Sequence, residues 1–494
     1  MQNPSVDSPI PLASSKLTKK SLDACLEMIR KQYLSDNRPW VIGFSGGKDS
    51  TCILQLAWQA LAFMPREKLT KPVYIITSDT LVETPAVETH LTRTTQLISE
   101  AAKAQGLPFE AHQVTPLTDE TFWVNIIGRG YPVPYTRFRW CTEKMKIRPV
   151  TRFISDKVAE YGEVVLLLGS RISESASRAQ VMNNRDKVGA ASNCLARHKD
   201  LASAYVFTPI ENWSTPDVWT YLTSTKCPWG GDNSEIVTMY RNAQAGECPL
   251  VIDKTTPSCG GGRFGCWTCT VVEKDRSMEA MVDNGEEWLS HLLDFREWLM
   301  QTEEPERRKQ IREVRRRNGR IEFFNYADGK TDFKYGPFKL AFRKEILERL
   351  LRTQKLVRAE GPDPNVKLIK DEELHRIRQL WHHEEGDWED SLPAIVERAT
   401  GERLDWLDDD WSGMGGAEKR ILEEVSSESG LHPNLLIELM DVERKFHGMS
   451  RRHDVYKKLE ITLNKDWRSV EQAYADQGLV TSTGTDQQEE NSAD

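Results

Sequence analysis

The chain has 494 residues, of which 39% are hydrophobic and 29% are charged, which is enough for about three folded domains. This composition excludes a wholly disordered chain. Because no apolar run approaches the roughly 20 residues of a membrane span, and the first twenty residues carry lysines without an apolar stretch, we expect a cytoplasmic protein with no membrane segment. The formal net charge is −9. Residues 384–411 account for all of it, with eleven acidic and two basic side chains, so the remainder can still carry basic surfaces.

Changes in composition along the chain predict six segments. They are a flexible arm (1–20), a domain of alternating strands and helices (21–229), a cysteine-rich segment (230–275), a charged helical region (276–360), a helical C-terminal region (361–476) and a disordered tail (477–494). In the second segment the expected strands are 40–44, 73–77, 109–114, 164–168 and 205–207, and the expected helices are 51–63, 85–103, 147–161 and 215–223. This alternation predicts an α/β fold with a doubly wound parallel sheet, which binds ligands beyond the carboxyl ends of its strands.

The sharpest local motif follows the first expected strand. It is Ser45-Gly46-Gly47-Lys48-Asp49-Ser50. The glycines allow close approach of an anion, the serines add hydroxyl groups, and the next helix begins with free amides, so the motif favours a phosphate ligand. Lys48 can neutralise phosphate charge, and Asp49 can cap the helix or help to hold Mg²⁺. The spacing differs from a Walker A loop, and the alternative is an ordinary strand–turn–helix connection.

This motif resembles the PP-loop of ATP pyrophosphatases, and three further motifs and a helix start resemble those of phosphoadenylylsulfate reductases. They are Asp79-Thr80-x3-Thr84-Pro85, Arg139-Trp140-Cys141-Thr142 with Lys146-Ile147-x-Pro149, Gly169-Ser170-Arg171-x2-Glu174-Ser175-x2-Arg178, and Asn212-Trp213 with Asp217-Val218-Trp219. The resemblance covers residues 40 to about 225 and implies a PP-loop (adenine nucleotide α hydrolase-like) domain that binds ATP with Mg²⁺.

The resemblance also implies roles for individual residues in this domain. Asp79 and Gly169 would contact the nucleotide together with the six residues of the loop, and Lys48, Asp49 and Arg171 would act in catalysis. Asp79 could instead simply form a turn, and each single basic residue could be a solvated surface charge.

Four of the nine cysteines lie close together in a glycine-rich stretch. They are Cys248, Cys259, Cys266 and Cys269. An odd number of cysteines without an export signal does not favour disulfides, whereas four thiolates suit tetrahedral zinc or an iron–sulfur cluster. One short Cys-x2-Cys pair with two longer gaps favours a [4Fe-4S] cluster over structural zinc, and uncoordinated thiols are the least favoured alternative.

A reductase-like domain, this cysteine spacing and a charged helical C-terminal part together resemble the DndC-type proteins of DNA phosphorothioation. The resemblance implies a sulfurtransferase that uses ATP to activate a DNA backbone phosphate, releases AMP and pyrophosphate, and replaces a non-bridging oxygen with sulfur. It further implies that the four cysteines hold the cluster, that a cysteine desulfurase donates sulfur, and that other phosphorothioation proteins are partners. Cys141 would be a sulfur relay or a buried thiol, and the remaining cysteines would be structural.

Three other functions stay open from the sequence. The first is a phosphoadenylylsulfate or adenylylsulfate reductase, disfavoured by the long C-terminal half and by Cys269 being the last cysteine. The second is a tRNA-thiolating enzyme, disfavoured by the reductase-like motif around Arg171. The third is a non-catalytic subunit that binds ATP and a metal and organises partner proteins.

A basic stretch is the candidate DNA-contacting surface. Residues 301–320 hold eight basic and four acidic side chains, and Phe323, Phe324 and Tyr326 follow. Arginine contacts phosphates and aromatic rings stack on bases, although a charged helix face and a pair of core phenylalanines would give the same pattern. Arg451, Arg452, Lys457 and Lys458 form a weaker candidate.

Overall fold

The computed structural model describes residues 15–174, 195–198, 201, 203–243, 265–325, 331–404, 415–446 and 454–477. The chain divides into two compact units. The first unit contains the residues up to 122 together with 134–296, and the second contains 123–133 together with the residues from 297 onward. Among the described residues, no helix is both long and apolar enough to cross a membrane.

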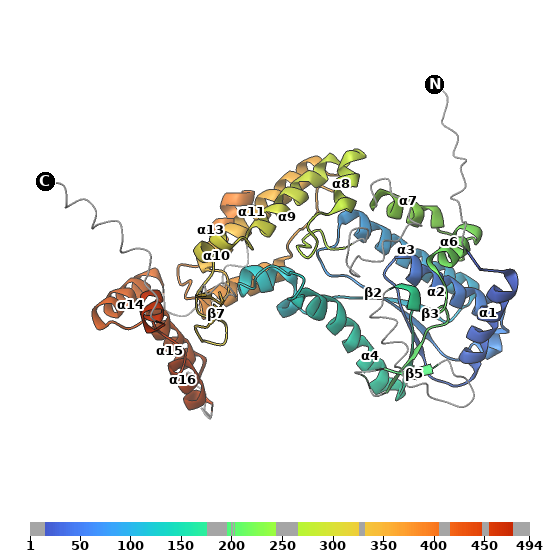
Figure 1. Cartoon of the computed structure of the whole chain (residues 1–494), viewed down its shortest axis with the longest axis horizontal. Helices are drawn as coiled ribbons and strands as arrows, with labels where there is room; N and C mark the ends of the chain where they lie inside the picture. The colour runs from blue at the N-terminus through green and yellow to red at the C-terminus, as the bar shows by residue number, and fades with distance from the viewer. Residues whose placement is uncertain are drawn as a thin grey trace, which may run out of the picture. The chain divides into compact units, whose positions relative to one another are not determined.

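A six-stranded sheet with the order β3-β2-β1-β4-β6-β5 organises the first unit (Figure 1). Its strands are β1 (Trp40–Gly43), β2 (Val73–Ser78), β3 (Phe109–Val114), β4 (Val164–Leu167), β5 (Leu195–Arg197) and β6 (Ala204–Phe207). Five strands pair in parallel, whereas β5 runs antiparallel at the edge. The strand order confirms the predicted doubly wound α/β fold, and β5 is the one strand of this sheet that the sequence did not predict.

Helices cover both faces of this sheet. They are α1 (Lys19–Leu34), α2 (Lys48–Ala62), α3 (Pro85–Gln105), α6 (Thr215–Ser224) and α7 (Asn233–Ala243) on one face, and α4 (Arg148–Tyr161) on the other. Successive residues of a strand point to opposite faces, so Trp40 and Ile42 of β1 enter the core under α1 and α2, while Val41 packs on the side of α4. Both faces are therefore apolar along the central strands, which explains why β1 and β4 read as continuous hydrophobic runs.

Short helical turns connect the main elements. They are η1 (Arg66–Lys68), η2 (Thr118–Glu120), η3 (Val124–Gly128), η4 (Thr142–Ile147), η5 (Ile172–Glu174) and η6 (Glu287–Leu289). The first unit also contains α8 (Arg276–Asp283) and the start of α9 (Ser290–Gln301).

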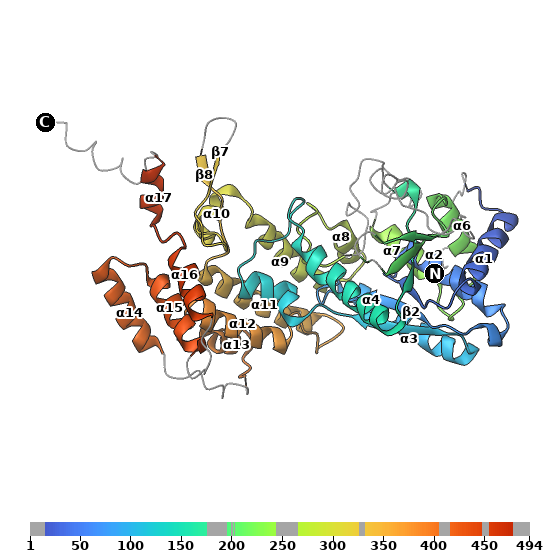
Figure 2. The same cartoon turned by 90° about the horizontal axis from the view of Figure 1, so that it is seen from below.

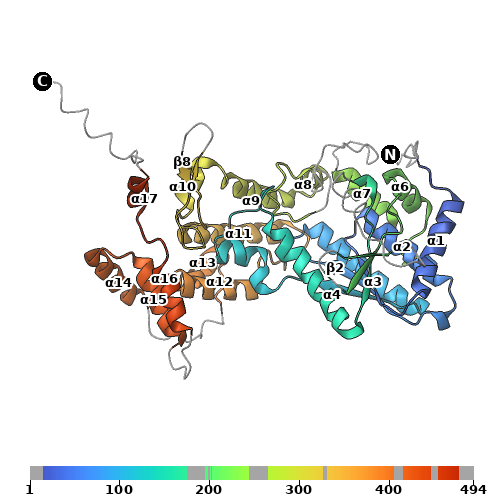
Figure 3. The ribbon, with the colours of Figure 1, turned by 60° about the horizontal axis from the view of Figure 1, so that its bottom comes forward.

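The second unit is mainly helical, as the sequence predicted. Its further helices are α10 (Pro305–Ile311), α11 (Leu340–Glu360), α12 (Asp371–Glu384), α13 (Ser391–Thr400), α14 (Gly416–Ser429), α15 (Pro433–Phe446), α16 (Val455–Leu463) and α17 (Val470–Asp476). Figure 3 shows α14, α15 and α16 grouped together. An antiparallel hairpin, β7 (Phe323–Asn325) with β8 (Thr331–Phe333), lies next to α10 (Figure 2) and packs on Tyr474 of α17.

Residues 123–133, which we call the exchange segment, belong to the second unit although the chain on either side of them belongs to the first. The indole of Trp123 donates to the carbonyl of Leu368 at 2.6 Å, and the indole of Trp381 donates to the carbonyl of Ile127 at 2.8 Å. Trp123, Ile126 and Ile127 are fully buried. The polypeptide therefore leaves the first unit, completes part of the second unit's core, and returns.

Candidate active site

The loop between β1 and α2 is shaped by two glycines. Gly46 has a φ of +71°, and a side chain there would also approach Leu91 to within 2.7 Å. Gly47 precedes α2 as its N-cap and offers no side-chain oxygen to the first amides of that helix. These amides carry partial positive charge. The loop thus has the geometry that binds a phosphate group, and we call residues 45–50 the phosphate loop.

The two serines of the loop brace its backbone. The Ser45 amide donates to Oγ of Ser50 at 3.2 Å, and the Ser50 hydroxyl donates to the carbonyl of Gly47 at 3.0 Å. The hydroxyl oxygens of the two serines lie 3.1 Å apart. In this conformation the serines hold the curvature of the loop, which keeps its amides oriented.

Lys48, Asp49 and Arg171 form one charged network. Asp49 accepts from Nζ of Lys48 at 2.9 Å and from Nε of Arg171 at 2.8 Å, and Arg171 is almost completely buried, with 1% of its surface exposed. Burial raises the pKa of Asp49, but the neighbouring Lys48 and Arg171 outweigh it and hold that pKa below its ordinary value. Arg171 is thereby fixed as a buried cation, and both carboxylate oxygens of Asp49 accept from cations. This arrangement does not fit Mg²⁺ bound by Asp49.

Gly169, at the end of β4, lies directly against the start of α2. A β-carbon at this position would stand 2.6 Å from the carbonyl oxygen of Asp49. The absence of a side chain therefore allows the strand to approach the charged network, which explains why a glycine stands two residues before Arg171.

Asp79 follows β2 and shapes the turn after it. One carboxylate oxygen accepts from the amide of Leu81 at 2.7 Å and the other accepts from the side chain of Gln113 at 3.2 Å. Leu81 has a φ of +64°, a conformation that non-glycine residues seldom adopt. In this structure Asp79 forms and stabilises the turn, the alternative that its position had left open.

The Cys266-x2-Cys269 turn is attached to the segment that follows β2. The Trp267 amide donates to the carbonyl of Val82 at 3.0 Å, and Cys266 forms an antiparallel bridge with Glu83. The Cys266 sulfur lies 3.3 Å from the hydroxyl of Thr80. Because β2 neighbours β1, whose end carries the phosphate loop, the cysteine turn and the loop lie at the same edge of the sheet.

Cys141, Cys266 and Cys269 all belong to the first unit. Burial, followed by the charge of Glu83, raises the pKa of Cys266. Burial, followed by the proximity of Cys269, raises the pKa of Cys141, which stands just before η4. Lys146 lies 3.7 Å from Glu83 and adds one positive charge.

Several predicted residues lie outside the described part of the chain. They are Cys248, Cys259, Arg178 and Cys194. Within the described part no group of three or more His, Cys, Asp or Glu side chains is arranged to hold a metal ion. Of the four predicted cysteine ligands, this part contains Cys266 and Cys269. Two thiols at this spacing, in a turn closed by a 3.0 Å bond from the Cys269 amide to the Cys266 carbonyl, fit zinc or an iron–sulfur cluster.

Sequence reasoning did not identify Arg296, which holds the cysteine turn in place. Arg296 is 1% exposed, and its Nε donates to the carbonyl of Cys269 at 2.7 Å. A second guanidinium nitrogen donates to the carbonyl of Val272. A lone arginine within a helical, charged region gave no signal of this role.

The arginine-rich stretch lies in the second unit, where much of it makes intramolecular contacts. Arg312 is buried and donates to the carbonyl of Gly336 at 2.9 Å, and the guanidinium of Arg315 lies 4.1 Å from the ring centroid of Trp467. Arg315, Arg316 and Arg317 line a cavity of about 430 Å³ that five carboxylates also line. Positive and negative side chains therefore line the cavity together, so it is not a purely basic site for anions.

The exposed remainder of this stretch still offers cations and one aromatic ring. Arg316, Arg320 and Lys309 are exposed, although Arg316 pairs with Glu322 at 2.7 Å and Lys309 with Glu306 at 2.8 Å. Phe324 is 48% exposed at the hairpin. Phe323 instead packs on Phe333 with ring centroids 4.9 Å apart. Tyr326 and the pair Arg451 and Arg452 lie outside the described residues.

Comparison with known proteins agrees with this geometry. Residues 39–271 match the model of the phosphoadenosine phosphosulfate reductase domain. An uncharacterized protein of Methanocaldococcus jannaschii is 26% identical over 245 residues, a match that spans 50% of this chain but only 39% of that protein.

Two solved structures show distant likeness. One is a phosphoadenylyl-sulfate reductase from Candida auris in a phosphate complex, with a TM-score of 0.28 and 15% identity over 46% of this chain and 95% of that one. The other is a U34-tRNA thiolase from Methanococcus maripaludis with its [4Fe-4S] cluster, with a TM-score of 0.27 and 13% identity over 57% of this chain and 81% of that one. Scores this low carry no argument about the site.

The domain match, the sheet order and the glycine loop agree with one another. The chain carries a domain similar to that of phosphoadenosine phosphosulfate reductase, and most of the matched residues lie in the first unit with its mainly parallel six-stranded sheet.

Proposed function

We propose that this chain is an ATP-dependent sulfurtransferase that modifies the DNA backbone. The observation that supports it is the position of the Cys266-x2-Cys269 turn, which is hydrogen-bonded to the segment after β2, while the phosphate loop follows β1. Paired strands lie about 4.8 Å apart, so a nucleotide in the loop and sulfur at these thiols would share one edge of the sheet.

The proposed reaction has two balanced steps. A non-bridging oxygen of the DNA phosphate attacks the α-phosphorus of ATP, and pyrophosphate leaves with the bonding electrons. A sulfur nucleophile then attacks the activated DNA phosphorus, and AMP departs with the original DNA oxygen. The amides at the start of α2 and the ammonium of Lys48 would bind the departing pyrophosphate, because preorganised donors stabilise such developing charge.

The thiols of Cys266 and Cys269 would hold a [4Fe-4S] cluster together with Cys248 and Cys259. When bound, the cluster would supply a sulfur-binding and redox-active group beside the nucleotide. Cys141 would carry the sulfur as a persulfide whose outer sulfur attacks the activated phosphorus. An external thiol reductant would then supply the two electrons that break the S–S bond, which restores the Cys141 thiol and leaves the sulfur on phosphorus.

The proposed partners follow from the resemblance to DndC-type proteins. They are the DNA backbone, a cysteine desulfurase as the sulfur donor, and companion phosphorothioation proteins. The exposed Arg316 and Arg320, and Phe324 of the hairpin, would contribute to DNA contact, since such groups bind phosphates and stack on bases.

The test combines cellular and biochemical measurements. Mass spectrometry of digested DNA should find phosphorothioate dinucleotides in cells that carry the gene and none in cells that lack it. Cys266→Ser and Cys269→Ser should abolish them, whereas Cys227→Ser, at a half-buried cysteine outside the turn, should not.

The anaerobically purified protein should release pyrophosphate from ATP, and ¹⁸O placed in the DNA phosphate should appear in AMP. Release of ADP and inorganic phosphate would reject the proposal.

A reductase for a sulfated nucleotide is the second candidate, because the matched domain model is that of phosphoadenosine phosphosulfate reductase. Incubation with phosphoadenylylsulfate and a thiol reductant would then yield sulfite. Sulfite formation without any phosphorothioate in DNA would favour this candidate over the first.

A further inference from the structure

Helix α7 carries a tyrosine to the phosphate loop. The hydroxyl oxygen of Tyr240 lies 3.4 Å from the backbone nitrogen of Lys48, which donates to it. A methyl group placed on Gly47 would stand 3.2 Å from the same hydroxyl. Tyr240 is 192 residues away from Lys48 in the sequence, and no motif predicted this contact.

The beginning of α7 is fixed on α2. Asn233 and Gln55 are both buried, and Nε2 of Gln55 donates to Oδ1 of Asn233 at 2.7 Å. The side-chain nitrogen Nδ2 of Asn233 also donates to the carbonyls of Leu222 and Thr225, at 2.8 and 3.0 Å. The helix that carries Tyr240 is thereby held against the helix whose first amides form the loop.

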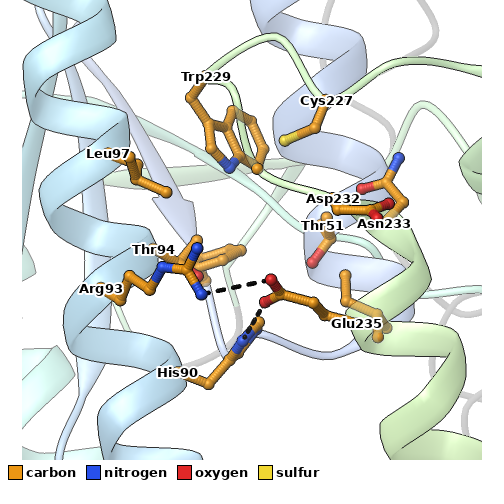
Figure 4. A pocket seen from close by; sticks show the side chains of 13 residues that line it. Thr51, His90, Arg93, Thr94, Leu97, Cys227, Trp229, Asp232, Asn233 and Glu235 are labelled. Carbon is orange, nitrogen blue, oxygen red and sulfur yellow. Dashed lines mark hydrogen bonds and ion pairs between the residues drawn. The ribbon is translucent and has the colours of Figure 1, made fainter.

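A second attachment holds α7 to α3. Figure 4 shows the carboxylate of Glu235 directed at His90 and Arg93, with contacts of 3.5 and 3.4 Å. His90 itself reaches the loop, since its ring carbon lies 3.7 Å from the position of a β-carbon on Gly46. The first turn of α7 is thus anchored on both neighbouring helices.

The tyrosine ring is held on two sides as well. The rings of Trp219 and Tyr240 meet edge to face with centroids 5.2 Å apart, and Nζ of Lys48 lies 5.4 Å from the centroid of the Tyr240 ring. Because both the helix and the ring are held, the hydroxyl is positioned at the amide end of α2.

We propose that Tyr240 is a phosphate-binding residue of the nucleotide site. Amides at a helix N-terminus are the donors that bind phosphate oxygens, and the Tyr240 hydroxyl lies at one of them. A phenol both accepts and donates, so it accepts from the Lys48 amide in this structure and donates to a phosphate oxygen that the loop holds. This inference rests on the proposed nucleotide site and adds to it a residue from outside the strand–loop–helix motif.

The variant Tyr240→Phe tests this role in the full-length protein, because it removes the hydroxyl and keeps the ring. A hydrogen bond to a charged group contributes about 1.5–3 kcal/mol, which corresponds to a loss of about tenfold or more in affinity. ATP binding, and inhibition of ATP binding by inorganic pyrophosphate, should both weaken by this factor. The rise in melting temperature that pyrophosphate causes should shrink in parallel, while the melting temperature without pyrophosphate stays at the wild-type value.

Tyr161→Phe is the matched control, because its hydroxyl pairs with that of Tyr74 at 3.0 Å on the other face of the sheet. It should bind ATP as the wild type does. Unchanged or tighter ATP and pyrophosphate binding by Tyr240→Phe would overturn the role of Tyr240 while leaving the nucleotide site intact. A wild-type protein that binds no ATP would instead reject the proposed function, and the inference with it.

Discussion

At Gly169 the two chain segments that build the charged network approach each other closely. Alanine there would place its β-carbon 2.6 Å from the Asp49 carbonyl oxygen, so either β4 or the start of α2 must shift. Overpacking of this kind costs about 1–3 kcal/mol. We expect Gly169→Ala to lower the free energy of unfolding by that amount and to abolish ATP binding, as measured by denaturant unfolding and calorimetry.

The control for Gly169→Ala is Gly43→Ala in β1. The nearest atom to a β-carbon at Gly43 is 4.0 Å away, an ordinary contact. Its unfolding free energy and ATP affinity should stay close to those of the wild type. Equal effects of the two substitutions would contradict the steric explanation.

Asp49 gives a prediction for the pH dependence of stability. Its pKa in the folded protein lies below the ordinary 3.8, because Lys48 and Arg171 outweigh burial. A depressed carboxyl pKa contributes stability that is present above the unfolded pKa and is lost as the pH falls through the folded one.

Asp49→Asn should therefore cost roughly 3–5 kcal/mol at neutral pH, because it leaves Arg171 as a buried cation without its carboxylate. The difference from the wild type should shrink as the pH falls below about 3.8, and urea unfolding at several pH values measures it. Asp283→Asn, at an exposed position of α8, should show neither effect. A difference that stays constant down to the lowest pH would refute the assigned charge state.

At the scale of the element, the contact between α9 and the cysteine turn provides a prediction about metal binding. Arg296 donates to the carbonyls of Cys269 and Val272, and groups that orient metal ligands commonly change affinity by about 10–100-fold. If the turn binds metal as proposed, Arg296→Met should weaken metal retention against a chelator by that factor and leave ATP binding unchanged.

Arg276→Met makes the same change at an exposed residue of α8 and should retain metal as the wild type does. Loss of ATP binding in Arg296→Met, with metal retained, would show that Arg296 supports the nucleotide site rather than the cysteine turn.

A strand or helix can be predicted from the sequence when its own residues carry the pattern that forms it. The strand Val164–Leu167 was predicted to within one residue, because buried parallel strands are continuous apolar runs. The edge strand Phe109–Val114 was predicted with its observed bounds although it is only partly buried. Helix α7 was not predicted, since the glycine and cysteine content of 230–270 obscured the helical spacing of Ile236, Val237 and Tyr240.

The contacts that complete the site could not be predicted from the sequence alone. The bond from Lys48 to Tyr240 and the bonds from Arg296 to the cysteine turn join distant segments through packing, which no local pattern encodes. The hairpin illustrates the same limit, because Phe323 and Phe324 are adjacent and equally apolar. Their alternation in a strand makes one of them part of a small core and leaves the other exposed.

At the scale of the whole molecule, the exchange segment predicts how fragments behave. A fragment of residues 15–296 would retain Trp123, Ile126 and Ile127 without the second-unit partners that bury them. We expect it to associate and to bind an apolar dye, because exposed apolar patches promote association. Replacing residues 123–133 with a Gly/Ser linker of equal length should yield a monomer, as measured by light scattering. A monomeric unmodified fragment that binds no dye would contradict the burial described for the segment.

The exchange segment also sets an order of events during synthesis on the ribosome. Trp123 emerges 245 residues before Leu368, the residue that accepts its hydrogen bond. At roughly 5–20 residues per second, this interval lasts about 10–50 seconds. During that time the nascent chain, whose first unit ends only at residue 296, displays an apolar loop without its partners, which makes it a client for chaperones that hold unfinished polypeptides.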